Sequence, residues 1–345
     1  MPAKAILCTL GPASMRPDIV KELDARGIDM FRINLSHTPP DAVESTIEFV
    51  RRYSSTAICI DTEGAQVRCG KMMPGVVLTK GQAVRLTSTA SVGTADTLAV
   101  RPPSVLEELR VGSALQVDFD CAELRVTSVG EGDVEAIVVD GGHVGSNKAM
   151  TIEPPPRLPP FTDHDVTAVK LSVGHGIRHF ALSFTNEAED VARFRDLVPP
   201  DSYVIAKIEN KTGVQNVEGI TSAADAVLID RGDLSREVAI EDVPAYQKHI
   251  IRCANALSTP VFVATNLLES MITHRVPTVA EANDIVNTLY DGANGLVLAA
   301  ETAIGEHPVQ SVDMVLRVLE AFERSTAGPV LGEQPAAAGG PALRP

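Results

Sequence analysis

The sequence predicts an α/β fold, a (β/α)8 TIM barrel with a small all-β domain inserted after its third strand. Eight short apolar runs alternate with segments whose apolar residues recur at helical spacing. The runs are apolar almost throughout, as strands of a parallel sheet are when both faces are buried. The third unit is interrupted by a long stretch rich in valine, threonine and glycine. The chain has 345 residues, 44% of them hydrophobic, which is enough for a core of barrel size.

The barrel elements are predicted from these runs in chain order. The eight strands are expected at residues 5–10, 29–35, 56–62, 179–184, 203–209, 226–230, 259–265 and 295–301. The clearest helical patterns are "DIVKELDARG", "DAVESTIEFVRRY", "VPAYQKHIIRCANAL" and "VQSVDMVLRVLEAF". Asp41, which follows two prolines, is the predicted N-cap of the second of these helices.

Four segments follow from this pattern. The first part of the barrel is expected at residues 1–70 and the inserted β domain at 71–156. The second part of the barrel is expected at 157–325, entered through the proline-rich "EPPPRLPPF". Residues 326–345 are rich in alanine, glycine and proline and are predicted to be a disordered tail.

Composition argues against several classes of protein. A formal net charge of −15 disfavours a nucleic-acid partner, because binding to phosphate backbones needs basic surface. No apolar run is long enough for a membrane span, and the N-terminus lacks the order of a secretory signal. The five cysteines are scattered without a CxxC pair, which argues against a disulfide framework. We therefore expect a cytoplasmic protein, with a composition compatible with a homo-oligomer.

Polar residues gather where the predicted strands end, which is where a barrel of this kind carries its functional site. Lys207 and Glu209 lie two positions apart on one strand and so share a face. They form either a solvated ion pair or part of a metal and phosphate site. The other polar residues at or just beyond strand ends are Arg32, Asn34, Ser36, His37, Asp61, Thr62, Arg68, Ser183, Arg231, Gly232, Asp233, Thr265 and Glu301.

These residue types suit phosphoryl transfer. Glu209 and Asp233 offer carboxylate oxygens, and Mg2+ prefers few protein carboxylates with water and substrate oxygens around them. Lys207 and Arg32 supply cations for a phosphoryl group whose charge spreads over its oxygens. The backbone amides of "RGDLS" would open the next helix and could seat an anion. A second set of oxygens, suited to a monovalent cation such as K+, comes from Asn34, Ser36, Asp61 and Thr62.

The chain resembles the pyruvate kinases. The matching stretches occur in family order from residue 5 to about residue 325 and are "CTLGPAS", "FRINLSHT", "DTEGAQVR", "VGSNKAM", "AKIENKTGV", "RGDLSREV", "ATNLLESM", "PTVAEANDIVN" and "AAETAIGEHPV". The resemblance implies transfer of phosphate from phosphoenolpyruvate to ADP, followed by protonation of the enolate to pyruvate. It also implies that the inserted β domain is a lid whose closure excludes water.

The resemblance further implies a role for each site residue. Lys207, Arg32 and Thr265 would be catalytic, and Gly232, Asp233 and Ser183 would join them in binding substrate. Mg2+ or Mn2+ would be held by Glu209 and Asp233, and K+ by Asn34, Ser36, Asp61 and Thr62. The residues expected to bind nucleotide are Arg68, Lys148, Asn34 and His37.

Several positions depart from the family pattern. The usual "DTKGPEIR" is "DTEGAQVR", which introduces Glu63 and Gln66, and the usual "SFVRKA" is "SFTNEA", which introduces Asn186. Asp230 stands where alanine is usual before RGD, and Phe119 stands where the lid usually has an acid. The family's C-terminal domain has no expected counterpart. Two other functions therefore stay open: a metal-dependent pyruvate or enolate lyase or aldolase, and a ligand-binding pseudoenzyme.

Overall fold

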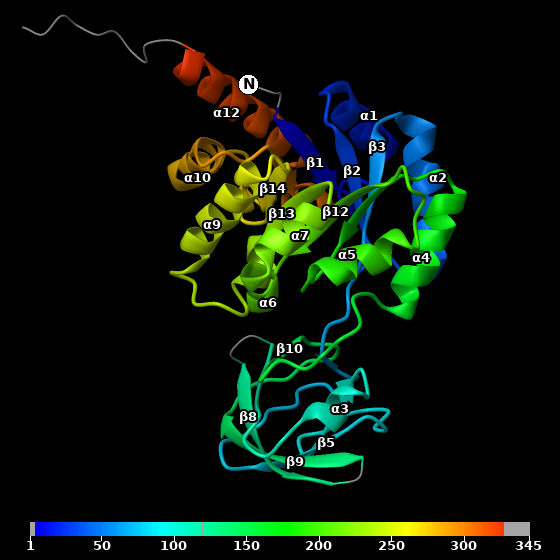
Figure 1. The fold of residues 1–345 in the computed structure, drawn as a ribbon, viewed down its shortest axis with the longest axis vertical. Helices are drawn as coiled ribbons and strands as arrows, with labels where there is room; N and C mark the ends of the chain where they lie inside the picture. Colours follow the sequence, from blue (N-terminus) through cyan, green and yellow to red (C-terminus); the bar gives the residue numbers. More distant parts are fainter. Residues whose placement is uncertain (1–3, 119–120, 131, 328–345) are drawn as a thin grey trace, which may run out of the picture.

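A computed structural model describes residues 4–118, 121–130 and 132–327 (Figure 1). All eight predicted strands form, and they close a parallel barrel in the order β1-β2-β3-β11-β12-β13-β14-β15. Their bounds are β1 Ala5–Thr9, β2 Met30–Asn34, β3 Ala57–Asp61, β11 His179–Leu182, β12 Tyr203–Ile208, β13 Ala226–Asp230, β14 Val261–Ala264 and β15 Gly295–Leu298. The predicted (β/α)8 fold is confirmed.

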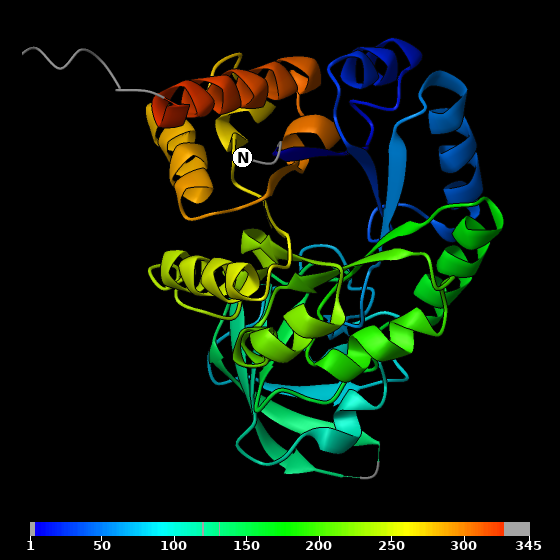
Figure 2. The same cartoon turned by 45° about the horizontal axis from the view of Figure 1, so that its top comes forward.

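The helices surround the barrel, as the turned view in Figure 2 shows. They are α1 Pro17–Ala25, α2 Val43–Tyr53, α4 Asp163–Gly174, α5 Ala188–Arg195, α6 Lys211–Gln215, α7 Val217–Ala223, α8 Arg231–Leu234, α9 Val243–Ala256, α10 Val279–Tyr290, α11 Ala300–Ala303 and α12 Pro308–Ala327. Two 3-10 turns, η1 Pro40–Ala42 and η2 Glu269–Ile272, complete this shell. None of the described helices is long and apolar enough to cross a membrane.

The predicted N-cap at Asp41 is wrong. Asp41 lies inside the 3-10 turn η1, and helix α2 takes Ala42 as its N-cap residue. Pro40 is the first residue of this turn, and its fixed φ suits a helical first turn, so the tight turn forms before the helix begins.

A second sheet lies apart from the barrel, in the order β10-β7-β8-β9-β5-β6-β4. It is mostly antiparallel and encloses its own apolar cluster, which includes Val84, Leu98, Leu115 and Val138. Its elements are β4 Arg68–Cys69, β5 Ala83–Thr87, β6 Thr97–Arg101, β7 Ala114–Val117, β8 Ala122–Val129, β9 Asp133–Asp140, β10 Met150–Glu153 and the four-residue helix α3 Val105–Glu108. Figure 1 shows this sheet below the barrel, joined by the two chain segments that lead into and out of it.

The described residues include only part of the predicted insert and only the first two residues of the predicted tail. The domain boundaries stay predictions. Helix α12 runs two residues into the segment expected to be disordered, and residues 328–345 lie outside the described part of the chain. Phe119 also lies outside the described residues.

The inside of the barrel changes from apolar to polar along its strands. A small buried cluster inside the barrel contains Leu7, Cys59, Ala181, Ile205, Leu228, Phe262 and Val297. Strand residues two positions apart share a face, so the next inward residues are Thr9, Asp61, Ser183, Lys207 and Asp230. The apolar layer therefore supports a polar layer at the carboxyl ends of the strands.

Candidate active site

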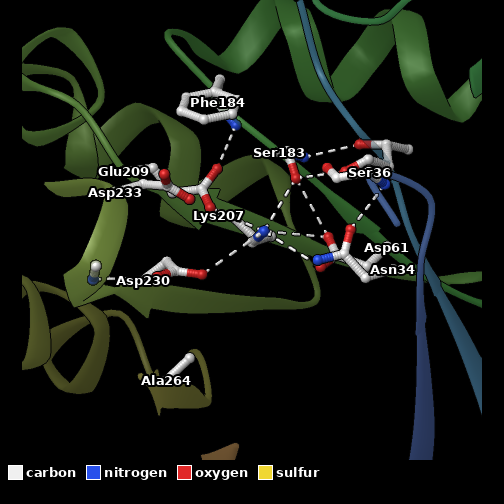
Figure 3. A network of polar contacts seen from close by, with 12 residues as sticks. Asn34, Ser36, Asp61, Ser183, Phe184, Lys207, Glu209, Asp230, Asp233 and Ala264 are labelled. Carbon is white, nitrogen blue, oxygen red and sulfur yellow. Dashed lines mark hydrogen bonds and ion pairs between the residues drawn. The ribbon is translucent and has the colours of Figure 1, made fainter. Parts of the chain in front are cut away.

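Lys207 is at the centre of the polar layer and is almost completely buried, with 3% of its surface exposed. Its Nζ lies 2.8 Å from Oε1 of Glu209, 3.0 Å from Oγ of Ser183 and 3.2 Å from Asp61. Figure 3 shows these side chains converging on Lys207 from neighbouring strands. Burial acts to lower the pKa of Lys207, but the charges of Asp61 and Glu209 outweigh it and raise the pKa. The lysine is therefore held as a buried cation.

Arg32 is the second buried cation. Its Nε donates to Oδ2 of Asp61 at 2.6 Å, its Nη2 also pairs with this oxygen, and its Nη1 donates to Oγ1 of Thr9 at 3.0 Å. Burial acts to raise the pKa of Asp61, but the charges of Arg32 and Lys207 outweigh it and lower the pKa. Asp61 is thus a fixed anion shared between two cations.

Three carboxylates form the opposite half of the layer. Glu209, Asp230 and Asp233 each place an oxygen within 4.8 Å of the others. Burial raises the pKa of Glu209 to about 8, with the charges of Asp233 and Asp230 adding to it and that of Lys207 opposing it. Burial and the charge of Asp230 also raise the pKa of Asp233, although Arg236 lies 3.0 Å from its carboxylate. This half carries negative charge that its protein neighbours do not balance.

The acidic half fits a divalent cation. Oε2 of Glu209 accepts from the backbone N–H of Phe184 at 2.6 Å, and the buried Oε1 has Nζ of Lys207 at 2.8 Å as its close partner among the described residues. Across the whole layer, two buried cations face four carboxylates. Hard oxygen ligands with excess negative charge are what Mg2+ and Mn2+ require. The residues present therefore suit such an ion.

The predicted K+ ligands do not present a comparable set of free oxygens. Both oxygens of Asp61 lie against Arg32, Lys207 and Ser183, and Oδ1 of Asn34 accepts from the amide of Ser36. Oγ1 of Thr62 accepts from the amide of Ser183 at 2.9 Å. The K+ site therefore stays a prediction, and we derive no step through this ion.

Thr265 and Gly232 lie beside the acidic half. The Gly232 amide donates to Oγ1 of Thr265 at 2.8 Å, and this hydroxyl lies 3.0 Å from Oδ1 of Asp230. Thr265 has φ of +67°, which is strained for a β-branched residue. The guanidinium of Arg231 holds this conformation through bonds of 2.6 and 3.1 Å to the Thr265 carbonyl, and Asp284 in turn binds Arg231 at 2.7 Å.

A cleft of about 740 Å³ lies between the barrel and the inserted sheet and reaches the polar layer at Asp233. Asp233 and Phe184 line it from the barrel, and Met150 and Ile152 line it from the insert. Gln66 and Asn186, two of the residues that depart from the family pattern, also line the cleft. The polar layer is thus accessible through its acidic half.

Other predicted residues lie away from the cluster. His37 and Ser36 are exposed on the loop after β2, and Glu301 accepts the amides of Leu268 and Ala299. Arg68 donates to the Asn147 carbonyl at 3.0 Å. Lys148 forms an ion pair of 2.8 Å with Asp118. A role for Arg68 or Lys148 at the site therefore requires the insert to move or these contacts to change.

Two parts of the site were missed by sequence reasoning. The Phe184 amide donates to Glu209 because Phe184 turns at φ of +51°, and no residue type signals this. Asp165 binds the amides of Glu63 and Gly64 at 2.7 and 3.1 Å and caps helix α4. The capping pattern of Thr162 and Asp165 was visible in the sequence, but the contact with the loop after β3 was not.

The comparisons with known proteins agree with this geometry. The family model for the barrel domain of pyruvate kinase matches residues 1–312. The pyruvate kinases of Thermococcus litoralis and Mycobacterium tuberculosis are each 35% identical to this chain, over 92% and 96% of its length. Plastidial pyruvate kinase 3 of Arabidopsis thaliana is 34% identical over 93%. The chain covers 69%, 72% and 58% of these three proteins, respectively.

A solved structure gives the same result. The crystal structure of a pyruvate kinase from Cryptosporidium parvum superposes with a TM-score of 0.84 at 28% identity. The match covers 93% of this chain and 69% of that one. With the family model matching most of its length and the barrel and separate sheet both in place, this chain belongs to the pyruvate kinase family.

Proposed function

We propose that this chain is a Mg2+-dependent phosphotransferase of the pyruvate kinase type, converting phosphoenolpyruvate and ADP to pyruvate and ATP or catalysing a close variant. One observation carries the proposal: the buried Lys207 lies 2.8 Å from Glu209, with Asp233 in the same cluster lining the cleft. A cation and a metal-binding carboxylate beside one another match the needs of phosphoryl transfer.

Lys207 and Arg32 would stabilise the transferring phosphoryl group. Both are fixed before substrate arrives, because Asp61 binds them at 3.2 and 2.6 Å. Preorganised charges of this kind need no reorientation during the reaction. A divalent ion held by Glu209 and Asp233 would neutralise charge on phosphate and enolate oxygens.

Thr265, Gly232 and Ser183 would position the three-carbon part of the substrate. Thr265 supplies a hydroxyl just beyond β14 and Gly232 an amide just beyond β13, while Ser183 accepts from Lys207 at 3.0 Å. Bound close to these groups, the reacting phosphate would be confined to one orientation.

The nucleotide would enter from the cleft, and its proposed contacts are Arg68, Lys148, Asn34 and His37. Lys148 would have to exchange its ion pair with Asp118 for a phosphate, which movement of the insert could bring about. Closure of the insert on the barrel would then exclude water that hydrolyses the donor.

A pyruvate-release assay tests the proposal directly. Phosphoenolpyruvate is offered with several nucleoside diphosphates and Mg2+, with and without K+, to the wild type, Lys207→Ala and the exposed-helix control Lys170→Ala. We expect turnover that needs Mg2+, is lost in Lys207→Ala and persists in Lys170→Ala. No turnover with any nucleotide in the wild type contradicts the proposal.

Asp230 favours a second candidate, a metal-dependent lyase or aldolase acting on an enolate. Its carboxylate lies among Glu209, Asp233 and Thr265, where it changes the surroundings of the bound substrate. This function predicts metal-dependent exchange of the C3 protons of pyruvate without nucleotide. Exchange that needs nucleotide, or no exchange, contradicts it.

A further inference from the structure

Asp230 lies within hydrogen-bond distance of two donors that are proposed to position the substrate, the Gly232 amide and the Thr265 hydroxyl. Its side chain is buried, with 4% of the residue exposed, at the end of β13. Oδ1 accepts from the Gly232 amide at 3.2 Å and lies 3.0 Å from the Thr265 hydroxyl, which also lies 2.6 Å from the Ala264 carbonyl. The Gly232 amide also donates to Oγ1 of Thr265 at 2.8 Å, so Asp230 shares both donors with a second acceptor. A carboxylate of the protein therefore stands beside the donors that an anionic group would need.

The surrounding contacts fix this arrangement. Asp230 caps the short helix α8 through the same Gly232 amide. Arg231 holds the strained Thr265 backbone through two hydrogen bonds, and the hydroxyl itself lies 2.6 Å from the Ala264 carbonyl. Oδ2 of Asp230 lies 3.9 Å from Nζ of Lys207. The closer partners of Lys207 are Glu209, Ser183 and Asp61 (Figure 3).

A second carboxylate placed on these donors would be repelled. It would lie within hydrogen-bond distance of the groups that Asp230 already binds, in a buried site where like charges interact strongly. A neutral or positively charged group that can donate a hydrogen bond would instead find a ready acceptor. Specificity of this kind combines an attractive contact with a repulsive one.

We propose that Asp230 is a specificity-determining residue, which fills the Gly232 and Thr265 donors and selects against a substrate carboxylate there. The favoured ligands place a hydrogen-bond donor, such as an amide, hydroxyl or ammonium group, against Asp230. The inference rests on the proposed function for the position of the substrate's three-carbon part. It narrows that function, because a substrate that places a hydrogen-bond donor at Asp230 is preferred over one that, like phosphoenolpyruvate, would place a carboxylate there.

Oxalate and oxamate test this selection, because oxamate replaces one carboxylate of oxalate by an amide. Their Mn2+-dependent binding is measured by calorimetry for the wild type, Asp230→Asn, Asp230→Ala and the exposed-site control Asp201→Asn. We expect the wild type and Asp201→Asn to prefer oxamate. Removing the charge in either Asp230 variant tightens oxalate binding by about ten-fold or more relative to oxamate.

Three outcomes overturn the inference. One is an oxalate-to-oxamate ratio that is the same in all four proteins, and another is no binding of either ligand to any of them. The third is parallel weakening of Mn2+ and oxalate binding in the Asp230 variants, which would make Asp230 a metal ligand. Asp230→Asn keeps the size of the side chain, so the test remains valid if Asp230→Ala does not fold. Turnover of phosphoenolpyruvate is not part of the readout, so failure of the proposed activity and failure of this selection are distinguishable.

Discussion

The two halves of the polar layer differ in their charge balance and in their access to the cleft, which Asp233 of the acidic half lines. In the half formed by Arg32, Asp61, Ser183 and Lys207, the anion lies between two cations, and the Ser183 hydroxyl accepts from Lys207 and donates to Asp61. In the other half, three carboxylates lie within 4.8 Å of one another, with Lys207 2.8 Å from Glu209 and Arg236 3.0 Å from Asp233. The first half is complete without a ligand, and the second requires a cation.

The difference in charge balance is clearest at Asp61 and Glu209. Both are fully buried and both pair with Lys207. The pKa of Asp61 lies below its ordinary value because the charges of Arg32 and Lys207 outweigh burial, whereas burial and the other acids raise the pKa of Glu209 to about 8. The neighbours of a buried carboxylate, more than its depth, decide whether it is a fixed anion or a metal ligand.

The largest effect is expected from Lys207→Ala, which removes the cation that joins the halves. We expect phosphotransfer to fall at least about a thousand-fold, because a preorganised charge on the phosphoryl group is lost. The free energy of unfolding should fall by about 3–5 kcal/mol, since Asp61 and Glu209 lose a buried partner. Activity assays and urea unfolding measure the two effects, with Lys170→Ala as control. Wild-type activity in Lys207→Ala would contradict the assignment.

Asp61→Asn disrupts only the half that is complete without a ligand. It leaves Arg32 and Lys207 buried without their shared anion, which should cost about 3–5 kcal/mol of unfolding free energy. Urea unfolding of the metal-free protein measures this, with the exposed Asp201→Asn as the matched change. If the two variants are equally stable, the Asp61 pairs do not stabilise the fold.

Metal affinity should depend on pH through the acidic half. Because the pKa of Glu209 is about 8, it holds a proton at neutral pH that a metal ion must displace. Mn2+ affinity should therefore rise about ten-fold per pH unit up to about 8 and then level off. The same shift means that Glu209 contributes stability below about pH 4.5 that is lost as pH rises to about 8. Mn2+ titrations between pH 6 and 9 give the profile, and a flat profile would show that Glu209 is not a ligand.

The smallest expected effect is a change in unfolding free energy that has opposite signs in the two halves. Asp233→Asn removes one of three repelling carboxylates, so the metal-free protein should gain about 1 kcal/mol of unfolding free energy. Asp61→Asn should lose stability under the same conditions. Denaturation of both variants in a chelator provides the comparison, and a loss of stability in Asp233→Asn would mean that the acidic half is already balanced.

The sequence was sufficient for the barrel but not for the pairing inside its site. Buried parallel strands are apolar runs, so all eight could be located, and the two-residue period placed Lys207 and Glu209 on one face. The pairing of Asp61 with Arg32 and Lys207 depends on how far long side chains reach between β2, β3 and β12. That reach has no one-dimensional signal, so the sequence indicated Asp61 as an oxygen donor but not its pairing with Arg32 and Lys207.

Asp230 departs from the family pattern, but the sequence alone does not show which groups its carboxylate contacts. Its residue type stood out, but its contacts with Gly232 and Thr265 depend on the strained turn at Thr265 and on Arg231. Backbone strain of this kind is created by tertiary contacts, and threonine gives no local indication of it.

The most direct test of the difference between the halves is the number of Mn2+ ions bound by the substrate-free protein. Electron paramagnetic resonance is used to titrate the wild type and the double variant Glu209→Gln, Asp233→Asn at pH 8. The account predicts one tightly bound ion per chain in the wild type and none in the folded double variant. Equal stoichiometry in the two proteins would contradict the conclusion that the acidic half is a metal site.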